Sequence, residues 1–203
     1  MQSRLVVATH NSHKTEEIRE IVGSFFEEIL DLNDFPEIPE AVEDGTTFEE
    51  NSAIKAFAAS AMLTNAFILA DDSGLEVDAL DGAPGVYSAR YGGEKATDAD
   101  NRKRLLEELG KTGAKGKSRS GRFRCVLTVV KADRKLAVFS GSCEGILANE
   151  EKGEGGFGYD PLFIPDGYCE TFGQLASEVK HELSHRGKAL ALFSDWLRQQ
   201  DSK

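Results

Sequence analysis

Apolar and polar residues follow patterns that predict two strand–helix units in the first part of this chain. Leu5–Ala8 and Phe67–Ala70 are short, continuous apolar runs, which are typical of buried strands. Apolar residues recur at helical spacing after the first run, so we predict a helix that begins near Asn11 or Ser12, two good N-cap residues. The expected apolar face of this helix consists of Ile18, Ile21, Val22, Phe25, Phe26 and Ile29.

A second helix is predicted after a loop over residues 31–45 that is rich in proline and acidic residues. The stretch Thr47–Glu50 has the T-x-x-E form of a capping box, in which two side chains satisfy backbone N–H groups at the helix start. The helix should end near Asn65. Its expected apolar face consists of Ile54, Phe57, Ala58, Ala61 and Met62. Two strand–helix units in succession favour an α/β core.

The second half of the chain predicts a helix, a hairpin and a final helix. The helix is expected over residues 98–109, and two long strands over residues 123–131 and 136–142 should form an antiparallel hairpin. The last helix is expected over residues 184–200. Its buried stripe would consist of Leu190, Phe193, Trp196 and Leu197. Since no repeat or free linker interrupts these elements, residues 1–203 are expected to form a single α/β domain or two lobes that share a cleft.

Length and composition fit a protein that folds around its own core. The chain has 203 residues, of which 40% are apolar, and this is enough for a sizeable core. No apolar run approaches the roughly 20 residues that a membrane span requires, and residues 1–10 do not resemble a signal peptide. A cytoplasmic protein without a membrane contact is therefore expected. Cys125, Cys143 and Cys169 form no C-x-x-C pair, so we predict buried, reduced thiols.

The formal net charge of −11 argues against long nucleic acid as a partner, because binding to a phosphate backbone requires a positive face. A small polyanion such as a nucleotide remains possible, since a few lysines and a bound cation can reverse the local field. Residues 111–124 carry six Lys or Arg and no acid. We predict that this basic stretch is a solvated, flexible loop.

One candidate for phosphate binding is Thr9-x-Asn11-x-x-Lys14, between a predicted strand and a predicted helix. Free N–H groups and the helix dipole favour an anion at such a helix start, and Lys14 would add a positive charge. The spacing alone also fits an ordinary capped helix with a surface lysine.

A candidate for metal binding is the segment Ala70–Gly74, where Asp71 and Asp72 follow an apolar run and precede a glycine. We predict a loop at a strand end, in which adjacent carboxylates attract a hard cation. Since side chains alternate along a strand, the two aspartates should point in different directions. A polar turn whose aspartates bond to the backbone is the alternative.

Two further segments carry side chains that could bind a small ligand. In Gly155–Pro161, Phe157 and Tyr159 accompany Asp160 in a loop rich in Gly and Pro, which could stack on a flat ring and bond its edge. In Ser184–Gly187, which follows Lys180 closely, His185 and Arg186 could bond a carbonyl or a phosphate. A structural turn and a polar surface, respectively, are the alternatives.

Taken together, these motifs closely resemble the inosine triphosphate pyrophosphatase family over nearly the whole chain. The matching segments are residues 9–14, 47–56, 70–77, 82–91, 155–161 and 184–190. The resemblance implies an elongated mixed α/β sheet that forms two lobes with an active-site cleft between them, and usually a homodimer. It also implies Mg²⁺-dependent hydrolysis of ITP, dITP and XTP to monophosphate and pyrophosphate, which keeps deaminated purines out of DNA and RNA.

The resemblance also implies a role for each matching residue. The phosphate-binding loop would consist of Thr9, His10, Asn11, Ser12, His13 and Lys14, with Lys55 as a further contact. Metal ligation falls on Glu43 and Asp72, with Asp72 as the proton acceptor and Ser73 as a substrate contact. The base pocket would consist of Phe157, Gly158, Tyr159 and Asp160, with Lys180, His185 and Arg186 closing over the ring.

Two departures from the common family pattern are Asp44, where threonine is frequent, and Ser52, where alanine is frequent. The extra acid leaves open whether Glu43 or Asp44 reaches the metal. Two alternatives to this function remain: a related pyrophosphatase for modified pyrimidine or standard nucleotides, and a nucleotide-binding protein without catalysis. The aromatic loop that includes Phe157 argues against the first, and the metal carboxylates argue against the second.

Overall fold

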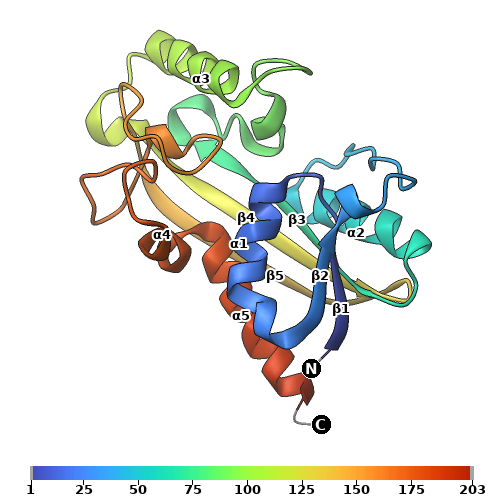
Figure 1. Cartoon of the computed structure of the whole chain (residues 1–203). Coiled ribbons are helices and arrows are strands. Elements are labelled where there is room, and N and C mark those ends of the chain that lie inside the picture. The colour runs from blue at the N-terminus through green and yellow to red at the C-terminus, as the bar shows by residue number, and fades with distance from the viewer. Residues whose placement is uncertain (1, 202–203) are drawn as a thin grey trace. The chain divides into compact units, whose positions relative to one another are not determined.

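A computed structural model describes residues 2–201, so the ends of the predicted domain, Met1 and residues 202–203, lie outside it (Figure 1). The described chain is mixed α/β, with one sheet in the strand order β2-β1-β3-β4-β5-β6. It divides into two compact units, each described separately below. Among the described residues, unit 1 comprises residues 2–72, 125–141 and 186–201, and unit 2 comprises residues 73–124 and 142–185. Strands β3, β4 and β5 contribute residues to both units.

Unit 1 is built on three parallel strands. These are β1 (Gln2–Val7), β2 (Phe26–Asp31) and the first part of β3 (Phe67–Val77). Strand β1 pairs in parallel with both neighbours, and Leu5 lies opposite Ile29 on one side and Phe67 on the other. The β-hairpin of β4 (Ser120–Lys131) and β5 (Arg134–Leu147) continues this sheet. Its turn is shorter than predicted, because only Ala132 and Asp133, both at positive φ, lie outside the strands.

Helices cover both faces of the sheet in unit 1. Helices α1 (Ser12–Val22) and α5 (His185–Asp201) pack against alternate strand residues such as Leu5, Val7 and Leu69. Helix α2 (Phe48–Met62) packs against the intervening residues, such as Val6, Ile68 and Ala70. Each apolar run is therefore buried on both faces, which explains why residues 5–7 of β1 and residues 67–70 of β3 show no polar alternation.

The first predicted helix ends earlier than its apolar pattern indicates. Helix α1 ends at Val22, and a short 3₁₀ turn over Gly23–Phe25 leads into β2. Phe26 and Ile29, expected on the helix face, therefore lie in a strand, and the prediction for them was wrong. Their side chains still pack in the same apolar cluster as Ile18 and Val22, which is why one pattern fits both structures.

Helix α2 begins at its predicted capping box, with Thr47 and Glu50 satisfying each other's backbone N–H groups. The face that it buries, however, was predicted incorrectly. The buried residues after the first turn are small, among them Ala56, Ala59 and Ser60. Phe57 and Met62 from the predicted apolar face are instead 38% and 56% exposed. Small side chains allow the helix to lie close to the sheet, where Ser52 Oγ and Thr128 Oγ1 form a buried hydrogen bond of 2.7 Å.

Unit 2 contains its own apolar core around the second part of β3. Its helices and strands are α3 (Asp98–Thr112), the remaining parts of β4 and β5, β6 (Phe163–Pro165) and α4 (Ser177–Leu183). Strand β6 pairs antiparallel with β5. Short 3₁₀ turns lie over Leu32–Asp34 in unit 1 and over Asp78–Leu80, Gly85–Arg90, Gly116–Arg119 and Asp160–Leu162 in unit 2. The core of unit 2 includes Leu75, Leu105, Phe123, Phe163 and Phe172.

The predictions for the basic stretch and for the three cysteines were wrong in part. The basic stretch 111–124 is not one flexible loop, because it contains the end of α3, a 3₁₀ turn and the start of β4. Arg119 is buried and donates to the backbone oxygens of Leu147 and Ala148. Cys125 and Cys143 are buried as expected, but Cys169 is exposed. Over residues 2–201, no helix combines the length and the apolar character needed to cross a membrane.

Candidate functional site

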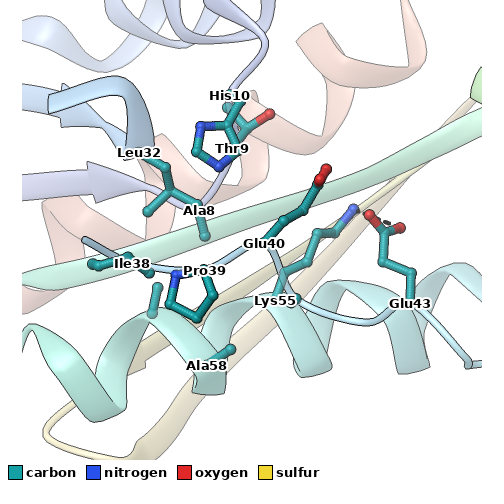
Figure 2. Close-up of a pocket in the computed structure, with 12 residues that line it drawn as sticks. Ala8, Thr9, His10, Leu32, Ile38, Pro39, Glu40, Glu43, Lys55 and Ala58 are labelled. Atoms are coloured by element: carbon teal, nitrogen blue, oxygen red, sulfur yellow. Dashed lines mark hydrogen bonds and ion pairs between the residues drawn. The ribbon is translucent and has the colours of Figure 1, made fainter. Parts of the chain in front are cut away.

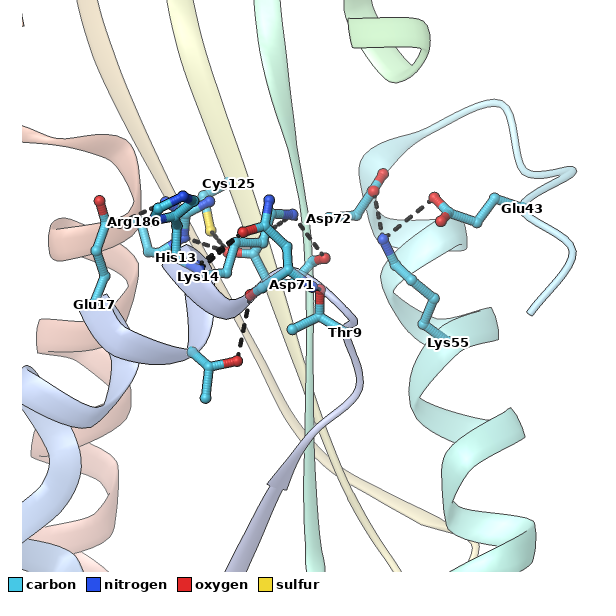
Figure 3. Close-up of polar contacts among 12 residues, drawn as sticks. Thr9, His13, Lys14, Glu17, Glu43, Lys55, Asp71, Asp72, Cys125 and Arg186 are labelled. Atoms are coloured by element: carbon cyan, nitrogen blue, oxygen red, sulfur yellow. Dashed lines mark hydrogen bonds and ion pairs between the residues drawn. The ribbon is translucent and has the colours of Figure 1, made fainter. Parts of the chain in front are cut away.

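Asp71 and Asp72 lie inside strand β3 and not in the loop that the sequence predicted. The strand therefore sets the direction of each side chain by simple alternation. Leu69 faces α1 and α5, Ala70 faces α2, and the next two residues continue this order. Asp71 consequently meets residues of α1 and α5, whereas Asp72 meets a residue of α2 (Figure 3). Paired charges on both faces explain how a strand can continue through two adjacent acids.

Asp71 is the centre of a buried ion-pair cluster. Its Oδ1 accepts from Lys14 Nζ at 2.7 Å, and its Oδ2 accepts from Arg186 Nε at 2.7 Å. The Arg186 guanidinium also donates to Glu17 at 2.6 Å, and the Cys125 thiol lies 3.4 Å from Asp71 Oδ2. Burial alone would raise the pKa of Asp71, but Arg186 and Lys14 outweigh burial and hold this pKa well below its usual range. Asp71 therefore stays ionised and fixes two cations.

Asp72 has a different environment on the α2 side of the sheet. Its Oδ1 accepts from Lys55 Nζ at 2.7 Å, and the same ammonium lies 3.2 Å from Glu43 Oε2 (Figure 3). Burial raises the pKa of Asp72 despite the opposing charge of Lys55. Burial would lower the pKa of Lys55, but Asp72 and Glu43 outweigh it and raise this pKa. Asp72 Oδ2 is buried and has no hydrogen-bond partner among residues 2–201.

A pocket in unit 1 brings the predicted phosphate loop and the predicted metal ligand together. Thr9 and His10 line it from the end of β1, Glu43 from the loop before α2, and Lys55 from α2 itself (Figure 2). Gly45 fixes this loop, since its N–H donates to Asn51 Oδ1 at 2.9 Å and a Cβ there would lie only 2.6 Å from that oxygen. Glu43, and not Asp44, forms the ion pair with Lys55 in this loop.

The start of α1 has the predicted position directly after β1. Asn11 is the N-cap, and its side chain accepts from the backbone N–H groups of His13 and Lys14. The Asn11 N–H in turn donates to Thr9 Oγ1 at 3.1 Å. The residues between Thr9 and Lys14, including Ser12, therefore form one ordered turn, and Lys14 projects from it toward Asp71.

In unit 2, Asp160 organises the loop Gly155–Pro161, which was predicted to bind the base and is called the base loop below. Asp160 Oδ2 accepts from the Phe157 N–H at 2.9 Å and from Lys180 Nζ at 2.9 Å. The Lys180 ammonium also lies 4.9 Å from the centre of the Phe157 ring. A Cβ at Gly156 would overlap the Asp160 carboxylate, so the loop requires glycine there. Phe157, Asp160 and Lys180 are thus brought together as predicted.

Three other residues predicted for the base pocket, Tyr159, His185 and Arg186, are buried and contact other residues of the protein. Tyr159 is 4% exposed, packs in the core of unit 2 and donates its hydroxyl to the Ser88 backbone oxygen at 2.8 Å. His185 is buried, with its ring stacked 4.8 Å from that of Phe123. Arg186 is 3% exposed and is engaged by Asp71 and Glu17, as described above. Ser73 lies in β3, directly after Asp72.

Several residues at these sites were missed in the sequence. Glu17 lies one helical turn after Lys14 in α1, and this spacing could have indicated that both face the same neighbours. Asp98 and Arg102 of α3 contact the backbone of Gly158, the loop residue beside Phe157. Nothing in the local sequence connects α3 with this loop, because the contact depends on tertiary structure.

The donors around Asp72 fit Mg²⁺ better than a metal that needs a complete protein cage. Asp72 and Glu43 offer hard carboxylate oxygens, and the buried Asp72 Oδ2 lacks a partner within the described chain. Mg²⁺ is commonly held by one or two carboxylates together with substrate phosphates and water. Among residues 2–201, no group of three or more His, Cys, Asp or Glu side chains is placed to hold a metal ion.

Comparisons with known proteins agree on one family. A sequence model of the Ham1 family matches residues 5–196. A dITP/XTP pyrophosphatase of Desulforamulus reducens is 48% identical over 187 residues, which cover 92% of this chain and 92% of that protein. A dITP/XTP pyrophosphatase of Listeria monocytogenes is 45% identical over 188 residues, covering 93% of this chain and 91% of that protein.

Solved structures give the same result. A HAM1 protein from Coxiella burnetii has a TM-score of 0.86 and 37% identity, with 98% of this chain and 100% of that chain covered. A nucleoside-triphosphatase, dITP/XTP pyrophosphatase, from Mycobacterium abscessus has a TM-score of 0.75 and 37% identity, with 94% of this chain and 98% of that chain covered. These likenesses confirm the fold class and the family resemblance that the motifs indicated.

Proposed function

This chain belongs to the Ham1 family, and we propose that it hydrolyses non-standard purine nucleoside triphosphates such as dITP, XTP and ITP. The products would be the nucleoside monophosphate and pyrophosphate, so deaminated purines would be removed from the nucleotide pool before they enter DNA or RNA. The observation that carries this proposal is that the two adjacent aspartates of β3 have different surroundings. Asp71 is committed to a buried ion-pair cluster, whereas Asp72 keeps one carboxylate oxygen without a hydrogen-bond partner in the described chain, beside Lys55 and Glu43.

The proposed reaction is attack of water on the α-phosphorus with departure of pyrophosphate. A bond forms between the water oxygen and the α-phosphorus, and the bond from that phosphorus to the bridging oxygen breaks. The Asp72 carboxylate would accept the proton that water loses as it attacks. Lys14 and Lys55 would neutralise phosphate charge, and positioning with charge neutralisation is the protein's main task in phosphoryl transfer.

We propose Mg²⁺ as the metal, held by Glu43 and Asp72. When bound, it would neutralise charge on the phosphate oxygens and polarise water for attack. The ion pairs support this proposal. Lys55 already lies between Glu43 and Asp72, which shows that these two carboxylates share one positive charge in the structure. A divalent cation on the same carboxylates would free the Lys55 ammonium to bind phosphate.

We propose that the base is bound by the loop around Phe157 and Asp160 together with Lys180. The 6-oxo group of ITP and XTP accepts hydrogen bonds, whereas the 6-amino group of ATP donates them. A cationic donor such as Lys180, held beside the Phe157 ring, therefore favours an oxo purine. Arg186 was predicted to donate to the base. In the structure its guanidinium donates to Asp71, so Arg186 also holds the Asp71 carboxylate in place.

One assay tests the proposed function. A panel of nucleotides that includes XTP, dITP, ITP, GTP, ATP and a modified pyrimidine triphosphate is incubated with Mg²⁺ or with a chelator, and pyrophosphate and orthophosphate are measured separately. We expect pyrophosphate from the deaminated purines and loss of the activity with chelator. Orthophosphate as the first product would overturn the reaction class. A shift in Tm with ITP but no product would indicate a binding protein.

We also propose that the protein forms a homodimer through the outer face of α2 and acts in the cytoplasm, where the nucleotide pool is found. Phe57 and Met62 expose apolar surface on this face, and Lys55 is the only charged residue over residues 51–66. Because each chain carries a formal charge of −11, two copies can approach most easily through an uncharged surface.

The dimer proposal is tested by molar mass in solution. Replacement of both Phe57 and Met62 with Ser should convert a dimer into a monomer. Leu192 of α5 is 50% exposed and provides the matched control, since Leu192→Ser should leave the mass unchanged. A monomeric wild-type protein would overturn the dimer, and a dimeric double variant would exclude this face.

A further inference from the structure

Helix α3 holds the base loop by the backbone of one glycine. The Gly158 N–H donates to Asp98 Oδ2 at 2.7 Å, and Arg102 donates to the Gly158 carbonyl oxygen at 2.8 Å. The two side chains come from positions i and i+4 of α3, so they lie on one face of the helix, one turn apart. Both backbone polar groups of Gly158 are therefore satisfied by charged partners from the same element.

Neither side chain is needed to start the helix. The capping box of α3 is formed by Thr97 and Asp100, which satisfy each other's backbone N–H groups. Asp98 is therefore available for Gly158. Arg102 has one further ionic partner in Glu151, at 2.9 Å, and its side chain is 15% exposed. A charged group that bonds to a backbone N–H or carbonyl makes a stronger hydrogen bond than a neutral one does.

A second connection fixes the next residue of the loop. The Tyr159 hydroxyl donates to the Ser88 backbone oxygen, and Ser88 Oγ accepts from the Leu75 N–H at 2.9 Å. Leu75 belongs to β3 and follows Ser73 by two positions. The loop is thus connected to α3 through Gly158 and to β3 through Tyr159 and Ser88.

Such contacts matter because the loop would otherwise have large conformational freedom. Gly156 and Gly158 have φ values of +72° and +60°. Glycine adopts positive and negative φ about equally readily, so these two residues alone do not hold the loop in one conformation. An unrestrained loop would lose this freedom when a base binds, and ligand affinity would fall accordingly. Phe157 precedes Gly158 and Asp160 follows Tyr159. When Gly158 is fixed before the base binds, Phe157 and Asp160 are held in one arrangement.

We infer that Asp98 and Arg102 are positioning residues that set base selectivity by fixing the Gly158 backbone. This inference rests on the proposed function, because it assumes that the loop around Phe157 contacts the base. Asp98 and Arg102 act through the loop and have no proposed contact with phosphate or water. Their loss should therefore weaken recognition of the base while the chemical step is largely retained.

The test compares Asp98→Ala and Arg102→Ala with Arg104→Ala as the matched control. Arg104 lies on the same helix, but it is half exposed and pairs only with Glu108 among the ion pairs of the described chain. Loss of one charge-assisted hydrogen bond predicts a rise of about tenfold in KM for XTP and dITP. We expect kcat to change by less than about threefold, and the preference for XTP over GTP to fall by about tenfold.

Two further variants make the result decisive. Arg102→Lys keeps a donor and should restore part of the selectivity, and Asp98→Asn provides a neutral acceptor if Asp98→Ala does not fold. Because both side chains hold one residue, the double alanine variant should show less than the product of the single effects. Wild-type selectivity in the folded variants, or an equal loss for all nucleotides, would overturn the inference. Absence of pyrophosphate release by the wild type would instead overturn the proposed function.

Discussion

Replacement of Asp71 with Asn should mainly reduce stability, because Asp71 is a buried anion with two cationic partners. Its side chain has no exposed surface, and Lys14 and Arg186 each lie 2.7 Å from one of its oxygens. Removal of one partner from a buried ion pair costs about 3–5 kcal/mol, since the remaining charge stays buried. For a chain of this size, each kcal/mol lowers Tm by about 2–4 °C, so a decrease of roughly 6–20 °C is expected.

The effect of Asp71→Asn should also depend on pH. Lys14 and Arg186 hold the pKa of Asp71 well below its usual value in the folded chain, whereas the unfolded chain has an Asp pKa of about 3.9. The unfolded state therefore binds a proton first as the pH falls. The contribution of Asp71 is complete well above the unfolded pKa and is lost as the pH falls through the folded pKa. The difference between wild type and variant should be constant near neutral pH and shrink in acid.

Urea unfolding followed by far-UV circular dichroism at several pH values provides the measurement. Asp195→Asn is the control, because Asp195 pairs with Arg198 on the surface, with both side chains 65% exposed, and such pairs contribute little. Two results would contradict this role of Asp71. One is a loss below about 1 kcal/mol at neutral pH, which is too small for a broken buried pair. The other is a loss that remains unchanged at acidic pH.

Three further predictions concern the metal, the base loop and the thiols. Lys55→Met removes the cation between Asp72 and Glu43, so Mg²⁺ should raise Tm more in this variant than in wild type; equal shifts in a thermal titration would contradict this. Gly156→Ala should lower the free energy of unfolding by at least about 1 kcal/mol and abolish base selectivity, because φ is +72° and the new Cβ would overlap Asp160; a folded, selective variant would disprove it. In the native protein, a thiol reagent should modify Cys169 rapidly and reach Cys125 and Cys143 only after unfolding, and rapid reaction of all three thiols would argue against this burial.

The sequence predicted most elements but failed where tertiary contacts override local preference. Strand β3 continues through Asp71 and Asp72 although aspartate is unfavourable in strands, because ion pairs on both faces compensate the charges. Strand β2 was missed because the spacing of Phe26 and Ile29 also continues the helical stripe of α1. A short apolar segment cannot be assigned to a helix or a strand by periodicity alone.

The candidate site was also only partly predictable. The motifs indicated the residues that we propose for phosphate, metal and base binding. The structure brings Glu43 together with Lys55 and Asp72, and Phe157 together with Asp160 and Lys180. The different roles of Asp71 and Asp72 could be anticipated from alternation along a strand, but their partners could not. The outward position of the larger apolar residues of α2 was missed, because it depends on the close approach of small residues such as Ala56 to the sheet.

Alternation along β3 places Asp71 in a buried ion-pair cluster that stabilises the fold and leaves Asp72 for the proposed chemistry. The most direct test is pyrophosphate release from XTP by Asp72→Asn, measured with Mg²⁺ beside the wild type and beside binding of the same nucleotide. We expect turnover to be abolished while the variant stays folded and still binds nucleotide. Turnover above a few per cent of the wild-type rate would contradict the role assigned to Asp72.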